Sequence, residues 1–198
     1  MADLEAVRVL GFAGSLRKGS YNRMALRAAQ ELLPQGMTLE TFDITPIPLY
    51  NEDVRAQGFP APVQEFRDRI AAAGALLIVT SEYNYSVPGV LKNAIDWASR
   101  PPNQPFEDKP VAIMGASPSM LGTARAQYHL RQSCVYLNMH VLNRPEVMIA
   151  HCHERFDAQG RLIDEKTRQM IAQLLSALGD WSRRLRAGQQ ELTRAQQQ

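Results

Sequence analysis

The chain has 198 residues, of which 45% are hydrophobic and 21% charged, and its formal net charge at pH 7 is +2. The composition is that of a globular protein, neither disordered nor fibrous, and the length suits one domain with one core. A charge this close to zero predicts neither a nucleic-acid groove nor a polybasic membrane surface. No run reaches the roughly 18 apolar residues of a membrane span, so we expect a cytoplasmic protein without one.

Strands and helices are predicted to alternate along the chain. Apolar runs predict strands at residues 7–13, 39–44, 75–80, 111–117 and 141–150, the last kinked at Pro145. Apolar residues at helical spacing predict helices at residues 22–33, 63–73, 88–99, 123–139 and 167–186. This alternation predicts a single α/β domain over residues 1–187, a doubly wound five-stranded parallel sheet with helices on both faces. Residues 188–198 are polar, and we expect them to form a frayed or disordered tail.

Three of the predicted strands end in loops rich in polar residues, at 14–22, 81–89 and 116–123. In doubly wound sheets, ligands bind beyond the carboxyl ends of the strands, where the strand order reverses. We therefore expect the three loops to form one site.

Glycines stand at Gly14 and Gly19 of the first loop and at Gly11 of the strand before it. This spacing is not the G-x-G-x-x-G of a dinucleotide site. The interval from Gly14 to Gly19 fits a Walker A loop, but Ser20 and Tyr21 stand where that motif needs lysine and the magnesium-binding hydroxyl. A triphosphate with its metal is therefore not predicted here.

The remaining polar groups of the first loop suit a terminal phosphate monoester. Backbone N–H groups at a helix start, the hydroxyls of Ser15 and Ser20, the Asn22 amide and the Arg17 guanidinium are all donors. No metal is required for such a site. The alternative is a solvated glycine turn with a lone surface arginine.

The second loop carries Glu82, Tyr83, Asn84 and Tyr85 between a buried strand and a helix that begins near Pro88. Tyrosines offer flat apolar faces with a hydroxyl, and the Asn84 amide offers a donor and an acceptor. A flat heteroaromatic ring edged with polar atoms needs both kinds of group. The alternative is a surface turn whose tyrosines only pack.

Three stretches, GSLRKGSYN, SEYNYSVPGVLKNAIDWASR and GASPSMLGTARAQYHLRQ, resemble the flavodoxin-like NAD(P)H-dependent FMN reductases, in the branch that includes chromate and quinone reductases. The resemblance covers about residues 7–150. It implies a flavodoxin-like sheet of order 2-1-3-4-5, bound FMN, NADPH or NADH as hydride donor, and a homodimer or homotetramer.

The resemblance also implies the roles of single residues. Ser15, Arg17, Ser20 and Asn22 would hold the FMN phosphate. The isoalloxazine ring would be lined by Glu82, Tyr83, Asn84 and Tyr85, with a further contact from Ser117. Because the flavin N5 carries the hydride, no catalytic acid or nucleophile is predicted, and Tyr85 is expected beside the incoming substrate.

The sequence departs from the family pattern at three positions. Family members commonly have proline where this chain has Ser81, and glycine where it has Ser119 and Thr123. These departures concern the rigidity and shape of the second and third loops, and with them substrate preference, more than flavin binding itself.

The predicted function is an FMN-dependent oxidoreductase that passes hydride from NAD(P)H to quinones, free flavins, azo compounds or metal oxyanions such as chromate, by a ping-pong mechanism. The alternative is a flavodoxin-like electron carrier without a nicotinamide site, although such carriers are usually strongly acidic and this chain is not. The acceptor, the choice of NADH or NADPH, and dimer against tetramer stay open.

Three further groups of residues are open to more than one interpretation. The segment HCHE at residues 151–154 has no second ligand pair with zinc-like spacing, so a strand end is favoured over a metal site. Cys134 is expected in the core, and both it and Cys152 as reduced thiols. Arg125, Tyr128 and Arg131 recur at helical spacing, as either a solvated face or a subunit contact; the resemblance favours the contact.

Overall fold

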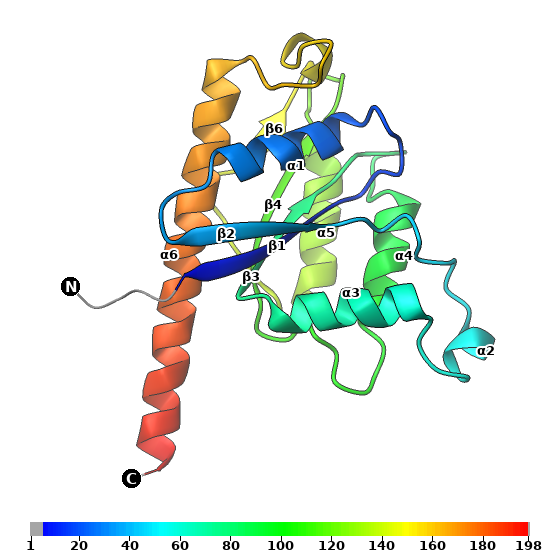
Figure 1. Cartoon of the computed structure of the whole chain (residues 1–198), viewed down its shortest axis with the longest axis vertical. Helices are drawn as coiled ribbons and strands as arrows, with labels where there is room; N and C mark the ends of the chain where they lie inside the picture. Colours follow the sequence, from blue (N-terminus) through cyan, green and yellow to red (C-terminus); the bar gives the residue numbers. More distant parts are fainter. Residues whose placement is uncertain (1–5, 198) are drawn as a thin grey trace.

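The computed structural model describes residues 6–197 and has one parallel sheet with helices on both faces (Figure 1). The strand order is β2-β1-β3-β4-β5, and β6 pairs with β4 as well. This order confirms the predicted flavodoxin-like arrangement. The strands are β1 (Val7–Ala13), β2 (Met37–Phe42), β3 (Ala75–Val79), β4 (Pro110–Ala116), β5 (His140–Val141) and β6 (Val147–Ile149). The helices are α1 (Tyr21–Glu31), α2 (Glu52–Arg55), α3 (Ala61–Ala72), α4 (Gly89–Ala98), α5 (Ala124–Tyr136) and α6 (Glu165–Gln196), with a 3-10 turn at Cys152–Glu154.

Two apolar cores lie on the two faces of the sheet. Side chains of a strand point alternately to opposite faces, so Leu77 packs on the side of α1 and α6 while Leu76 and Ile78 pack on the side of α3, α4 and α5. All five residues of β3 are fully buried. A strand covered on both faces reads as a continuous apolar run, which is why this strand was predictable.

The prediction of one strand at 141–150 is wrong. β5 pairs with the start of β4, where His140 lies opposite Pro110, and β6 pairs with its end, where Val147 lies opposite Met114. Pro145 lies between the two short strands and has no N–H to give to a ladder. The fifth place in the sheet is therefore shared by two strands.

The last helix is longer than predicted. α6 begins after Asp164 and continues to Gln196 rather than ending at Arg186. The prediction of a frayed or disordered tail is therefore wrong as far as Gln196. The residues after Arg186 are mostly Gln, Glu, Arg and Ala, which are good helix formers. Because they present no apolar face to the core, this part of the helix is exposed from residue 187 onwards. In Figure 1 this end projects past the sheet.

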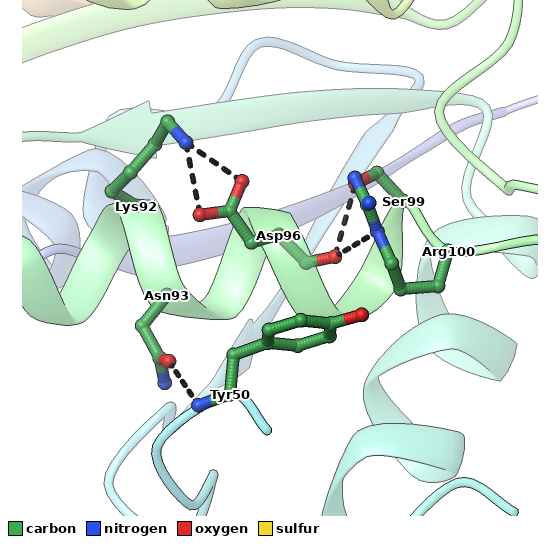
Figure 2. Close-up of polar contacts among 6 residues, drawn as sticks. All are labelled: Tyr50, Lys92, Asn93, Asp96, Ser99 and Arg100. Carbon is green, nitrogen blue, oxygen red and sulfur yellow. Dashed lines mark hydrogen bonds and ion pairs between the residues drawn. The ribbon is translucent and has the colours of Figure 1, made fainter. Parts of the chain in front are cut away.

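The long connection between β2 and α3 is fastened to α4, as Figure 2 shows. Asn93 accepts a hydrogen bond from the Tyr50 backbone N at 2.8 Å and donates one to the Pro48 carbonyl at 2.8 Å. The Tyr50 ring packs on Trp97, with 4.8 Å between the ring centroids. Since α4 begins at the end of the second polar loop, these contacts fix the base of that loop.

No helix within residues 6–197 is long and apolar enough to cross a membrane.

Candidate functional site

All three polar loops contribute to one cavity at the carboxyl edge of the sheet. Its volume is about 280 Å³, near the lower end of the range for small-molecule sites. The cavity is lined by Ser15, Arg17, Ser20, Tyr21, Asn22, Ser81, Glu82, Tyr83, Ala116, Ser117 and Pro118. Seven of the nine residues predicted to contact FMN are therefore brought together, and the other two, Asn84 and Tyr85, lie exposed in the same loop outside this lining.

The first loop ends in the N-terminus of α1. Ser20 caps the helix, and its hydroxyl accepts from the Arg23 backbone N at 3.4 Å. The first N–H groups of a helix have no partner within it, and they carry the positive end of the helix dipole. This end of α1 is thus set to receive an anion in the cavity.

Gly14 allows the first loop to approach α4 closely. A Cβ at this position would lie 3.0 Å from the Leu91 side chain and 3.2 Å from Pro88. Both contacts are tighter than ordinary van der Waals distance, so the helix after the second loop packs directly on the backbone of the first.

Asn22 joins the first loop to the third. Its Nδ2 donates to the Ala116 carbonyl at 3.0 Å, and its Oδ1 accepts from the Ala116 backbone N at 2.8 Å. The residue is buried. The end of β4 thus holds both polar atoms of Asn22, and one N–H of the amide is left for a ligand in the cavity.

Arg17 retains most of its hydrogen-bonding capacity. Its Nη2 donates to the Gly19 carbonyl at 2.7 Å, and the side chain is exposed at the rim of the cavity. A guanidinium has five N–H donors, so Arg17 can still donate hydrogen bonds to an anion in the cavity.

Burial raises the pKa of the nearby Cys152 thiol to about 11, although the Arg17 charge opposes this, so the thiol remains protonated at neutral pH.

The second loop is held by its own polar residues. The buried Ser81 hydroxyl donates to the Gly14 carbonyl at 2.8 Å, so the serine that departs from the family pattern ties the second loop to the first. Glu82 turns its carboxylate toward α5, where it pairs with Arg125 Nε at 2.7 Å and accepts from the Ala126 backbone N at 3.1 Å. The Glu82 charge in the cavity wall is thereby neutralised.

The third loop accommodates the other two departures. Ser117 Oγ accepts from the Ser119 backbone N at 3.1 Å. Thr123 is fully buried with a φ of 74°, and its hydroxyl accepts from Gln127 Nε2 at 3.1 Å. A Cβ on Gly115 would lie 2.1 Å from the Thr123 hydroxyl oxygen, so the threonine in the left-handed region packs directly against the backbone of β4.

Sequence reasoning did not assign Tyr21, Ser81 and Pro118 to the cavity. Tyr21 was considered only as a residue that breaks the Walker A motif. Ser81 and Pro118 carry no motif of their own, and only their position beside residues already assigned pointed to them.

A second cavity of about 280 Å³ lies between α1 and the end of β2 and shares Ser15 with the first. Its Arg23 is paired with Asp43 at 2.9 Å, so part of its charge is neutralised within the chain. Only one of the three loops lines this second cavity. We therefore place the functional site in the first cavity, which all three loops line.

Residues 151–154 do not form the strand end that we expected. β6 ends at Ile149, and a turn leads into the 3-10 turn at Cys152–Glu154. Within residues 6–197, no group of three or more His, Cys, Asp or Glu side chains is placed to hold a metal ion. Cys134 and Cys152 are both free and buried, and burial raises the pKa of Cys134 to about 12.

The donors in the cavity fit FMN without a metal. One end offers a guanidinium, two hydroxyls and a helix N-terminus, which suit a phosphate monoester. The other end offers the Tyr83 and Pro118 side chains and the Ser117 hydroxyl, which suit a flat ring with polar edges.

Comparisons with known proteins agree with this geometry. Residues 7–154 match the model of the NADPH-dependent FMN reductase family. An NAD(P)H-dependent FMN reductase of Pseudomonas aeruginosa is 63% identical over 91% of this chain and 97% of its own length. A quinone reductase of Escherichia coli is 44% identical over 92% and 98%. The solved structure of a flavoenzyme NAD(P)H:(acceptor) oxidoreductase from Paracoccus denitrificans superposes with a TM-score of 0.82 at 36% identity, over 90% of this chain and 98% of that one.

Proposed function

The chain belongs to the NADPH-dependent FMN reductase family, and we propose that it is an FMN-containing oxidoreductase that reduces quinones with NAD(P)H. The observation that carries this proposal is that the N-terminus of α1 with Arg17 and the second loop with Tyr83 line one and the same cavity. Bound FMN supplies the hydride carrier between the nicotinamide and the acceptor.

The residues of the three loops divide between the two ends of FMN. The phosphate is bound by the first N–H groups of α1 together with Ser15, Arg17, Ser20 and Asn22. Asn22 also fixes this loop to β4. The ring is lined by Glu82, Tyr83, Asn84, Tyr85 and Ser117. Tyr85 lies beside the acceptor, and the N-terminus of α4 stabilises negative charge at the pyrimidine edge of the ring.

The acceptors extend from quinones to free flavins, azo compounds and metal oxyanions such as chromate. NAD(P)H and the acceptor use the same pocket in alternation, which makes the kinetics ping-pong. The relatives and the solved neighbour reported above are named as reductases or oxidoreductases, which favours the enzyme over the electron carrier.

Residues 1–187 form the FMN-binding domain, and the end of α6 lies outside it. The enzyme is cytoplasmic and assembles as a homodimer or homotetramer. Arg125, Tyr128 and Glu146 contribute to the contact between subunits; within the chain, the Tyr128 hydroxyl already donates to Glu146 at 3.4 Å.

Absorption spectroscopy tests the proposed function. The purified protein, loaded with FMN and freed of excess ligand, should show the visible flavin band, and anaerobic NADPH or NADH should bleach it. Adding a benzoquinone should restore the band, and steady-state rates at several fixed quinone concentrations should give parallel double-reciprocal lines. FMN alone with the same nicotinamide is the control. A flavin band that neither nucleotide bleaches faster than in this control would contradict the proposal, and intersecting lines would reject the shared pocket.

A further inference from the structure

The turn in the second loop has a backbone that its sequence does not favour. Tyr83 and Ser86 exchange two backbone hydrogen bonds, of 3.1 and 2.9 Å, around the central residues Asn84 and Tyr85. Both central residues have positive φ, 48° and 67°. Two-residue turns of this kind favour Asn-Gly. Asn84 fits the first place, but Tyr85 stands where glycine is preferred, because a Cβ is disfavoured in the left-handed region.

Arg125 on α5 holds Tyr85 in this conformation. The guanidinium carbon lies 3.6 Å from the centroid of the Tyr85 ring, within the range of a cation–π contact. The ring itself is 67% exposed, so few apolar contacts from the rest of the chain cover it. Within the chain, the contact that covers this ring is its stacking on Arg125.

Arg125 is in turn held by the residue that begins the loop. Glu82, whose side chain is 8% exposed, pairs with Arg125 Nε at 2.7 Å and with the Ala126 backbone N at 3.1 Å. At the far side of the turn, Ser86 Oγ forms a 2.9 Å hydrogen bond with His129 Nδ1. One helix therefore holds the turn at both ends and in the middle.

We propose that Arg125 is a positioning residue: by stacking on Tyr85 it stabilises the left-handed conformation of that residue and so presets the turn that receives the flavin ring. The inference rests on the proposed function for the contact between this turn and the ring. Because Arg125 acts on the ring end of FMN, its removal affects FMN and riboflavin equally.

A double-mutant cycle tests this role. Arg125→Gln removes the cation over Tyr85 while its amide still donates to Glu82, and Tyr85→Gly gives the turn its preferred residue. Arg125→Gln alone should weaken binding of both FMN and riboflavin by about tenfold, given the strength of a cation–π contact and the cost of the left-handed region. In the Tyr85→Gly background the same change should weaken either affinity clearly less, because only the charge paired with Glu82 is then lost. An Arg125→Gln effect of equal size in both backgrounds, or no effect in either, would overturn the proposal.

A second readout needs no flavin. Hydrogen exchange at the Ser86 amide, which is bonded to the Tyr83 carbonyl, should quicken in Arg125→Gln and return to its original rate in Arg125→Gln/Tyr85→Gly. Arg69→Gln is the matched control, since Arg69 lies on α3 and pairs with the exposed carboxylates of Glu40 and Glu65; it should change none of these values. Failure of the unaltered protein to bind flavin would instead count against the proposed function, and the exchange rates would still decide the role of Arg125.

Discussion

Arg67 and Arg17 lie at opposite ends of the sheet and use their charges differently. Arg67 is 6% exposed and donates to four carbonyls: that of Ala98 at the end of α4, and those of Arg100, Pro102 and Asn103 in the loop before β4. Arg17 is exposed, lies in the loop after β1, and donates to the carbonyl of Gly19. An arginine whose donors are used within the chain stabilises the fold, whereas one with donors left at a cavity is available to a ligand.

Replacing Arg67 should give the largest loss of stability. Arg67→Ala leaves four carbonyls without their charged donor and removes the cation that stacks on the Phe59 ring at 4.1 Å, so we expect the free energy of unfolding to fall by about 3 kcal/mol. Urea denaturation measures this loss. Arg69→Ala is the control, since Arg69 makes exposed pairs with Glu40 and Glu65, which should contribute less than about 0.5 kcal/mol. Similar losses in the two variants would break the comparison.

Asp164 extends the comparison to an acidic residue with partners inside the chain. It caps α6 by accepting from the Thr167 backbone N at 2.9 Å and from the Thr167 hydroxyl. These hydrogen bonds, helped by Arg155, hold its pKa below the ordinary value of 3.8. We expect Asp164→Ala to cost about 1 kcal/mol at neutral pH, as for other N-caps.

The pH dependence of that cost follows from the sign of the shift. Because the folded pKa is lowered, the stabilising effect of the charge is fully present above the unfolded pKa and is lost as the pH falls through the folded one. The difference between Asp164→Ala and the unaltered protein should therefore shrink in acid. A difference that is constant from neutral pH down to the acid transition would show that the carboxylate charge contributes nothing.

Arg17→Ala should have the smallest effect on folding. The Arg17 side chain makes one hydrogen bond, to a nearby residue of the same exposed loop. Its removal should therefore change the free energy of unfolding by less than about 0.5 kcal/mol. Denaturation of the flavin-free protein checks this. A loss as large as that of Arg67→Ala would mean that Arg17 is a structural residue after all.

The family resemblance implied the sheet order, and the sequence indicated which residues reach the cavity better than it indicated their partners. Continuous apolar runs located β3 and β4, because both strands are buried on both faces. Asn22 lines the cavity, but its contact with Ala116 joins residues far apart in the chain, which no local pattern encodes. No local pattern encodes the hydrogen bond between Ser81 and Gly14 either. Nor does one encode the ion pair between Glu82, a predicted ring contact, and Arg125.

Two errors in the elements have local causes. The strand predicted at 141–150 was read from its apolar residues, and the pattern did not show that the segment around Pro145 leaves β4 before β6 joins it. The end of α6 was expected to fray because it is polar, but helix propensity alone extends it to Gln196.

Binding of FMN and riboflavin to the unaltered protein and to Arg17→Ala tests the central claim most directly. If the first loop holds the FMN phosphate, Arg17→Ala should weaken FMN binding by about 1.5 to 3 kcal/mol, the range for a hydrogen bond to a charged group. Riboflavin has no phosphate, so its affinity should be the same in both proteins. Equal losses for FMN and riboflavin, or no loss for either, would contradict the assignment of this loop to the phosphate.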